Sequence, residues 1–101
     1  MNTSEKIDWC KTCKLIIVFL VKKAWNKSCE KFALKLSEKC VETVCEEFPE
    51  ACEADPELVA GICAALGIAV ELYCKKYGSE YIKDHIDEIA QEVCKKVHAC
   101  P

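Results

Sequence analysis

Ten cysteines are the residues in this chain of 101 whose type and spacing could do chemistry. Such a density is typical of disulfide-linked domains from secreted or otherwise oxidised compartments. Cys10 and Cys13 open the set as Cys-x2-Cys, and Cys94 and Cys100 close it as Cys-x5-Cys. Two antiparallel terminal helices with this spacing would be tied first to last and second to second-last. The pattern therefore predicts the disulfides Cys10–Cys100 and Cys13–Cys94.

Zinc binding is the competing use of a Cys-x2-Cys motif, and Cys10, Cys13, Cys94 and His98 could in principle surround one ion. That site would leave six thiols unexplained, so disulfides are favoured and we expect no metal and no cofactor. No nucleophile and base stand in a recognisable catalytic motif, so we do not expect an enzyme.

The six inner cysteines allow fifteen pairings, which sequence alone does not settle. In an antiparallel helical hairpin, residues that face each other have numbers with a nearly constant sum. The numbers of Cys29 and Cys74 add up to the same total as those of Cys40 and Cys63. Both segments are Cys-x10-Cys, which is three helical turns to within about 20°, so both cysteines of each helix share a face. We therefore predict Cys29–Cys74 and Cys40–Cys63.

Cys45 and Cys52 remain, and a disulfide between them would close the turn of that hairpin. Five nested bridges would then lock the fold, each worth about 2–4 kcal/mol without simple additivity.

Helical periodicity runs through the chain and no β-alternation appears. We expect helices at about 4–25, from Asn26 or Ser28 to 47, at 56–77, and from Ser79 to the closing cysteines, with a turn at 48–55. Ser28, Asp55 and Ser79 are candidate caps, and Gly78 ends the third helix. The prediction is an all-α domain of four to five helices spanning residues 1–101.

In two of these helices, apolar residues cover more than one face. Leu15, Val18 and Phe19 lie off the inner face of the first, so they are either buried by a second neighbour or form a membrane or dimer surface. The third helix is rich in small residues, which favours tight packing inside the fold, with association in lipid as the alternative. These small residues are Ala60, Gly61, Ala64, Ala65, Gly67 and Ala69.

The net charge of −3 hides an asymmetry. Residues 1–41 carry nine lysines against four acids, whereas residues 42–74 carry eight acids and no lysine. A row of lysines recurs every four residues, either as a solvated face or as a docking surface for anionic lipid. The row consists of Lys23, Lys27, Lys31, Lys35 and Lys39. The chain has no arginine, so we do not expect nucleic acid binding.

The first five residues are polar, and the apolar run 15–21 follows the first two cysteines. We therefore expect a mature domain whose secretory leader has been removed. No run reaches the roughly 18 apolar residues of a spanning helix. Residues 58–73 come close, but Glu71 and two glycines weaken that interpretation.

With these cysteine spacings, the chain resembles the saposin-like family, whose four- or five-helix fold joins its ends by bridges from Cys-x2-Cys to Cys-x5-Cys. The ending from Val93 to Cys100 is similar to that of the amoebapores, and Cys100-Pro101 to that of the caenopores. The family usually has six cysteines, and a second alignment would make Cys63-x10-Cys74 its middle bridge. We prefer the hairpin, and we expect five bridges to make this domain stiffer than its relatives.

The resemblance implies a protein that is secreted or stored in secretory or lysosome-like granules, binds anionic lipid membranes, forms pores with antimicrobial effect, and assembles into homodimers or oligomers. Amoebapores carry a histidine in the same tail, associated with acid-triggered assembly, and it maps onto His98. A histidine side chain changes charge near pH 6.5 in general, so acid would add a positive charge there. The alternatives are a non-lytic lipid carrier, a secreted toxin or ligand that acts on a receptor or channel, and a twin-cysteine hairpin protein of the mitochondrial intermembrane space.

Overall fold

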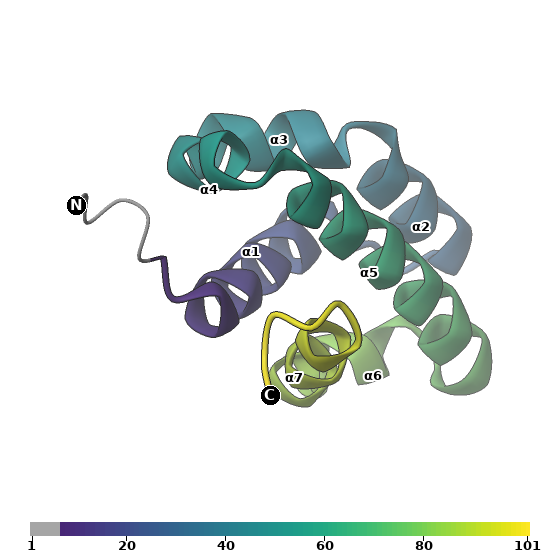
Figure 1. Ribbon diagram of the computed structural model, residues 1–101. Helices are drawn as coiled ribbons and strands as arrows, with labels where there is room; N and C mark the ends of the chain where they lie inside the picture. The colour runs from purple at the N-terminus through teal and green to yellow at the C-terminus, as the bar shows by residue number, and fades with distance from the viewer. Residues whose placement is uncertain (1–6) are drawn as a thin grey trace.

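A computed structural model describes residues 7–101 as an all-α protein, and no strand occurs in this range. Seven helices follow one another (Figure 1): α1 (Trp9–Ala24), α2 (Cys29–Glu38), α3 (Cys40–Glu47), α4 (Pro49–Ala54), α5 (Pro56–Tyr77), α6 (Ser79–Asp84) and α7 (Ile86–Lys96). The predicted all-α fold class is confirmed. There are more helices than predicted, partly because two of the four predicted helices are each divided in two, into α2 and α3 and into α6 and α7.

The helix ends differ from the predicted ones where a side chain caps the backbone. α1 begins at Trp9, not near residue 4, because Asp8 is extended and its carboxylate accepts a hydrogen bond from the Lys11 amide at 3.2 Å. Residues 4–6 lie outside the described range. Ser28 and Asp55 cap α2 and α5 as predicted.

Two predicted helices are broken, at Lys39 and at His85. The buried residues Phe32, Leu36, Cys40 and Val44 are spaced strictly by four, which drifts about 40° around a straight helix at each step. A break at Lys39 resets the direction, so that Cys40 and Val44 of α3 point into the core again.

Two smaller predictions are wrong as well. The segment predicted as a turn, 48–55, contains the short helix α4, which begins at Pro49 because proline fits the first helical position. Ser79 does not cap the last helix, because its hydroxyl donates a hydrogen bond to the Lys27 carbonyl at 3.0 Å instead.

All five predicted disulfides are present, and they are nested: Cys10–Cys100, Cys13–Cys94, Cys29–Cys74, Cys40–Cys63 and Cys45–Cys52. The alternative bridge between the two cysteines of α5 is therefore wrong. Three of the four proposed zinc ligands are bound in disulfides, so they offer no thiolates to a metal.

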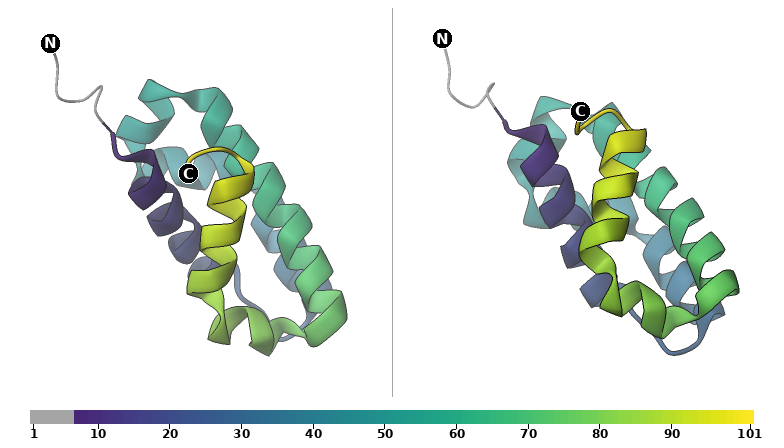
Figure 2. Two further views of the ribbon diagram at one scale, coloured as in Figure 1. Left: turned by 60° about the horizontal axis from the view of Figure 1, so that its bottom comes forward. Right: turned by 90° about the horizontal axis from the view of Figure 1, so that it is seen from below.

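The disulfides divide the fold into two covalently tied parts. The first two bridges join α1 to the end of α7, and the other three join α2, α3, α4 and α5 to one another. The ends of α1 and α7 that carry these bridges lie together at one end of the molecule, and the chain passes between the two parts at the other (Figure 2). No disulfide between described residues joins one part to the other.

The chain crosses between the two parts at residues 25–28 and again at Gly78, and hydrogen bonds hold these two crossings together. The Trp25 indole donates to the Ser79 carbonyl at 2.9 Å, beside the bond from Ser79 to Lys27, and the Lys83 ammonium lies 4.4 Å from the centre of the Trp25 ring. Gly78, at φ 99°, supplies a backbone conformation that other residues rarely adopt. The core between the two parts is built from fully buried side chains such as Phe32, Ile17 and Leu66.

Candidate functional site

The most apolar helix of the described chain, α5, is poorly buried. By length and composition α5 could cross a membrane, since it has 22 residues and a mean hydropathy of 1.8 in its most apolar window. A core helix would pass the same test by composition, but only 28 % of this window is buried. Packing inside the fold therefore does not account for the apolar character of α5.

The excess lies on the outer side of α5 and continues onto α2. Ile68 and Leu72 are each 60 % exposed, Leu34 is 59 % exposed, and Tyr77 is exposed near the end of α5. We call these four residues the apolar face. Single exposed apolar side chains are ordinary in soluble proteins, whereas a contiguous group marks a surface for contact with another apolar body.

Four of the six small residues of α5 do not serve the tight packing that the sequence favoured, whereas Ala65 and Ala69 are half-buried and pack against the core. Ala60 and Ala64 are exposed, and a side chain added at Gly61 or Gly67 would meet nothing within 4 Å. These positions leave open space along α5 in the isolated chain, so that interpretation is wrong for them.

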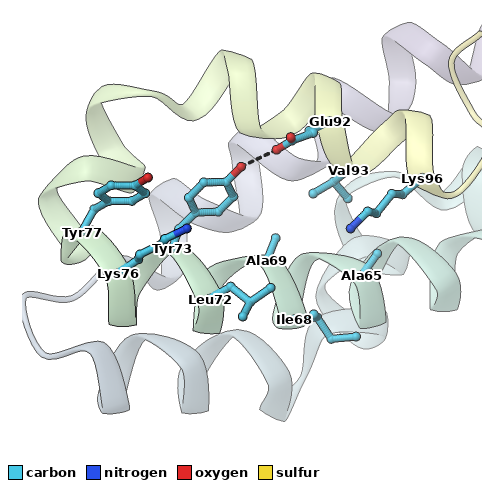
Figure 3. A pocket seen from close by; sticks show the side chains of 10 residues that line it. All are labelled: Ala65, Ile68, Ala69, Leu72, Tyr73, Lys76, Tyr77, Glu92, Val93 and Lys96. Carbon is cyan, nitrogen blue, oxygen red and sulfur yellow. Dashed lines mark hydrogen bonds between the residues drawn. The ribbon is translucent and has the colours of Figure 1, made fainter.

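A groove of about 410 Å³ runs between α5 and α7 beside the apolar face (Figure 3). Its apolar lining consists of the side chains of Ala65, Ile68, Ala69, Leu72 and Val93. Lysines 76 and 96 and the pair of Tyr73 with Glu92 supply its polar groups. A groove with an apolar lining and cationic side chains at its edge suits the acyl chain and the anionic head of an amphiphile.

Tyr73 and Glu92 are joined across this groove, because the phenol donates a short hydrogen bond to the carboxylate (Figure 3). This bond, together with burial and the negative charge of Glu92, raises the pKa of Tyr73 from 10.0 to about 12. The bond also occupies one oxygen of Glu92, the only carboxylate among the described residues that line the groove.

We expect one tyrosine to titrate about two pH units late, near pH 12, in an absorbance titration of the tyrosinate. Since the folded pKa lies above 10.0, this group contributes stability that is complete below pH 10 and is lost as pH rises through about 12. Glu92→Gln removes the carboxylate charge and should return this titration toward 10. A late titration that persists in Glu92→Gln would contradict the assignment.

Aromatic rings gather at the end of α5 and the start of α6. Tyr77 stacks on Tyr81 at 4.3 Å between ring centres, Tyr81 stacks on His85 at 4.0 Å, and Tyr73 lies 5.9 Å from Tyr81. The Lys76 ammonium lies 5.8 Å from the centre of the Tyr77 ring, and Lys75 is exposed in the same turn of α5. Tyrosine and lysine are the residues that anchor apolar helices at the boundary between lipid and water.

A second groove, of about 620 Å³, lies on the other side of the apolar face, between α2 and α5. Ala33, Ala64 and Gly67 line it, so it is open where side chains are small. Leu34 and Ile68 also border it, whereas its charged groups are Glu30, Glu71 and Lys75. Ile68 thus borders both grooves, and Leu72, one turn further along α5, borders the first.

The five lysines of the predicted docking row are all exposed. Lys23, Lys35 and Lys39 line one groove between α1 and α2, together with Glu38. Lys27 lies in the crossing segment, and Lys31 is in the first turn of α2. The structure therefore brings three of the five together, on the α1 side of α2 rather than on the α5 side.

The predicted apolar surface on the first helix is not continuous. Leu15 is 53 % exposed, but Val18 and Phe19 are half-buried, and the Phe19 ring packs edge to face on Phe48 at 5.8 Å. The interpretation as helix surface buried by a second neighbour fits Phe19, and Leu15 remains as a single exposed leucine.

His98 is exposed and is the one residue other than glycine with a positive φ in the described chain, at 65°. Its amide donates to the Lys95 carbonyl, and the next amide, of Ala99, donates to the Cys94 carbonyl at 2.8 Å. These two bonds form the Schellman motif that ends many helices, with His98 at the position usually taken by glycine. The backbone of His98 thus turns the chain so that Cys100 reaches Cys10, which the sequence pattern did not reveal.

Comparisons with models of protein families, with curated proteins and with solved structures give no match for this chain. The functional argument therefore stands on the residues and the geometry described above. The five disulfides indicate an extracellular or secreted protein.

Sequence reasoning missed the apolar face. Ile68 and Leu72 look like core residues, because α5 is apolar around most of its circumference and its periodicity is therefore weak. Leu34 lies on α2, two residues from the buried Phe32 and Leu36. The glycines were the available signal, since Gly61 and Gly67 cost helix stability and an added side chain at either would meet no described residue within 4 Å.

Proposed function

We propose that this is a secreted protein that binds anionic lipid membranes through the outer side of α5 and permeabilises them, with antimicrobial effect. The observation that carries the proposal is α5 itself, a helix apolar enough for a bilayer and mostly unburied. Burial of exposed apolar side chains in lipid is favourable by about 25 cal/mol per Å². The stacked tyrosines and Lys75 and Lys76 at the end of α5 suit the interfacial layer.

Anionic lipid is favoured over zwitterionic lipid because exposed lysines lie near the face and elsewhere on the first half of the chain. Lys76 and Lys96 border the groove beside the apolar face. The lysine row on α1 and α2 is a second cationic surface, and each lysine near an anionic membrane adds about 1 kcal/mol. The acidic segment 42–57 occupies α3, α4 and the start of α5, so we expect this part to stay away from the membrane.

Dye leakage from anionic and zwitterionic vesicles tests the proposal. The double variant Ile68→Gln/Leu72→Gln should lower leakage and vesicle binding at least about tenfold, because two apolar contacts with lipid are lost. Leu15→Gln is the matched control, since Leu15 is similarly exposed on α1, and we expect it to change neither quantity. Equal loss in both variants would contradict a membrane surface on α5.

The other candidate functions appear as outcomes of the same experiment. Vesicle binding without leakage indicates a lipid carrier. Neither binding nor leakage at any lipid charge would leave the secreted toxin or ligand as the alternative.

Activation by acid, in granules of low pH, is the finer part of the proposal and rests on His98. The substitution to test is His98→Asn, because asparagine tolerates the positive φ that alanine would strain. We expect leakage of anionic vesicles to be greater at pH 5 than at pH 7 in the parent, and this difference to disappear in His98→Asn. His85→Phe keeps a ring beside Tyr81 and should retain the difference.

A further inference from the structure

We infer that Asn26 is an acceptor for an N-linked glycan, so that the secreted protein carries an oligosaccharide where the chain passes from α1 to α2. The inference rests on passage through a secretory pathway, which the five disulfides indicate. It does not rest on membrane binding, and it concerns a part of the molecule that the apolar face does not include.

The sequence at this crossing is Asn26-Lys27-Ser28, an Asn-x-Ser triplet whose middle residue is not proline. Such triplets are the acceptors of N-glycosylation in secreted proteins, where they lie in surface loops. The oligosaccharide is donated by a polyprenyl diphosphate. A bond forms between Nδ2 of the asparagine and the anomeric carbon of the first sugar. The bond from that carbon to the diphosphate oxygen breaks, the diphosphate leaves with the electron pair, and Nδ2 loses one proton.

The position of Asn26 in the fold suits such a modification. It lies in the segment between α1, which ends at Ala24, and α2, which begins at Cys29. This crossing is at the end of the molecule away from the terminal disulfides (Figure 2). Lys27 is exposed there, and Asn26 itself is half-buried. A glycan on Asn26 would therefore leave the protein from a surface segment outside the helices.

The side-chain amide of Asn26 is held in one orientation with its nitrogen free. Its Oδ1 accepts a hydrogen bond from the Ser28 amide at 2.8 Å, which forms an Asx turn. Nδ2 donates no hydrogen bond to a described residue, and no side-chain nitrogen or oxygen among the residues that the structure describes is both buried and without a partner. Nδ2 is therefore open to solvent. A glycan replaces one of its two hydrogens and leaves Oδ1 bonded to Ser28.

The hydroxyl of the triplet also has a place in the folded protein. Ser28 Oγ accepts a hydrogen bond from the Lys31 amide at 3.3 Å and so caps α2. Transfer of the oligosaccharide acts on the chain before it folds, when this hydroxyl is not yet engaged. The cap and the acceptor triplet are therefore compatible.

The glycan would lie beside the end of α5. Ser79, two residues beyond the last residue of α5, donates its hydrogen bond to the carbonyl of Lys27, next to Asn26. Sugar hydroxyls are costly to move from water into an apolar phase, so this end of the molecule should stay in water. For the membrane-bound protein proposed above, the glycan would hold this end of α5 on the aqueous side. That consequence rests on the proposed function, whereas the site itself does not.

Secretion of the full chain from cultured mammalian cells, behind a secretory leader, tests the site. The intact mass should exceed the 11.4 kDa of the chain by at least one oligosaccharide, and peptide N-glycosidase should remove the excess. This enzyme converts a glycosylated asparagine into aspartate, so a peptide map after digestion in water labelled with heavy oxygen should mark Asn26. The map also separates Asn26 from the triplet Asn2-Thr3-Ser4, which lies outside the described residues. An unmodified Asn26 in the secreted parent would overturn the inference.

Three substitutions separate the glycan from the structural roles of the triplet. Asn26→Asp keeps an oxygen for the Ser28 amide, and Ser28→Asp keeps a cap for α2, but each destroys the triplet. Both proteins should fold, as judged by circular dichroism, and carry no glycan at this position. Ser28→Thr preserves the triplet and the cap and should be modified at least as fully as the parent. A glycan on Asn26 in Ser28→Asp, or its loss from Ser28→Thr, would contradict the acceptor role of this triplet.

Discussion

Removal of both terminal disulfides should destabilise the protein by more than the two single removals together. Each bridge shortens the loop that the other closes. With Cys10–Cys100 intact, Cys13–Cys94 closes an effective loop of only about 10 residues, and its loss costs about 2.7 kcal/mol. The loss of Cys10–Cys100 alone costs about the same, because Cys13–Cys94 then holds the ends.

The double removal opens a larger loop. With both bridges gone, the nearest remaining closure is Cys29–Cys74, and the effective loop rises to about 45 residues. The total cost is then about 6.7 kcal/mol, against about 5.4 kcal/mol for the sum of the single removals. Denaturant unfolding of paired Cys→Ala variants measures these free energies. Additive losses of about 4.5 kcal/mol for each bridge would instead show that each closes its full sequence separation independently.

Truncation of two apolar side chains on α2 should change the free energy of unfolding by very different amounts. Phe32 is fully buried, so Phe32→Ala should lower the free energy of unfolding by about 3–5 kcal/mol through lost burial and the cavity left behind. Leu34, two residues further along the same helix, is 59 % exposed, so Leu34→Ala should change it by less than about 0.5 kcal/mol.

The second variant also carries functional information. Leu34 belongs to the apolar face, so Leu34→Ala should weaken vesicle binding although the fold stays intact. Denaturant unfolding and vesicle flotation of both variants are the measurements. A large stability loss in Leu34→Ala would show that this leucine serves the core and not the surface.

The disulfides were predictable because they depend on numbering alone. An antiparallel hairpin fixes the sum of the positions that face each other, so Cys29–Cys74 and Cys40–Cys63 follow once the segments are helical. The ends of α5 could be predicted equally well, since Asp55, Pro56 and Gly78 each have a defined role in starting or ending a helix.

The helix breaks could not be predicted, since they arise from tertiary packing. Lys39 and His85 carry no sequence signal for a break, and the chain bends there so that the flanking apolar residues keep facing the core.

The expectation that five bridges stiffen the domain applies to one of its two parts. The three inner bridges stiffen the part formed by α2 to α5, but the contact between the two parts depends on packing and on the bonds around Trp25 and Ser79.

The nested bridges also govern what a protease can do to this protein. Every bond of the chain between Cys10 and Cys100 lies inside at least one covalent ring, so a single cut anywhere in that range releases no fragment. A cut in the crossing at Gly78, for example, leaves the two pieces joined by both terminal bridges. Because each ring encloses the next, the pieces of a clipped molecule stay tied together and its helices can stay packed. Such a protein would remain one covalently linked molecule after its first cleavage by a protease.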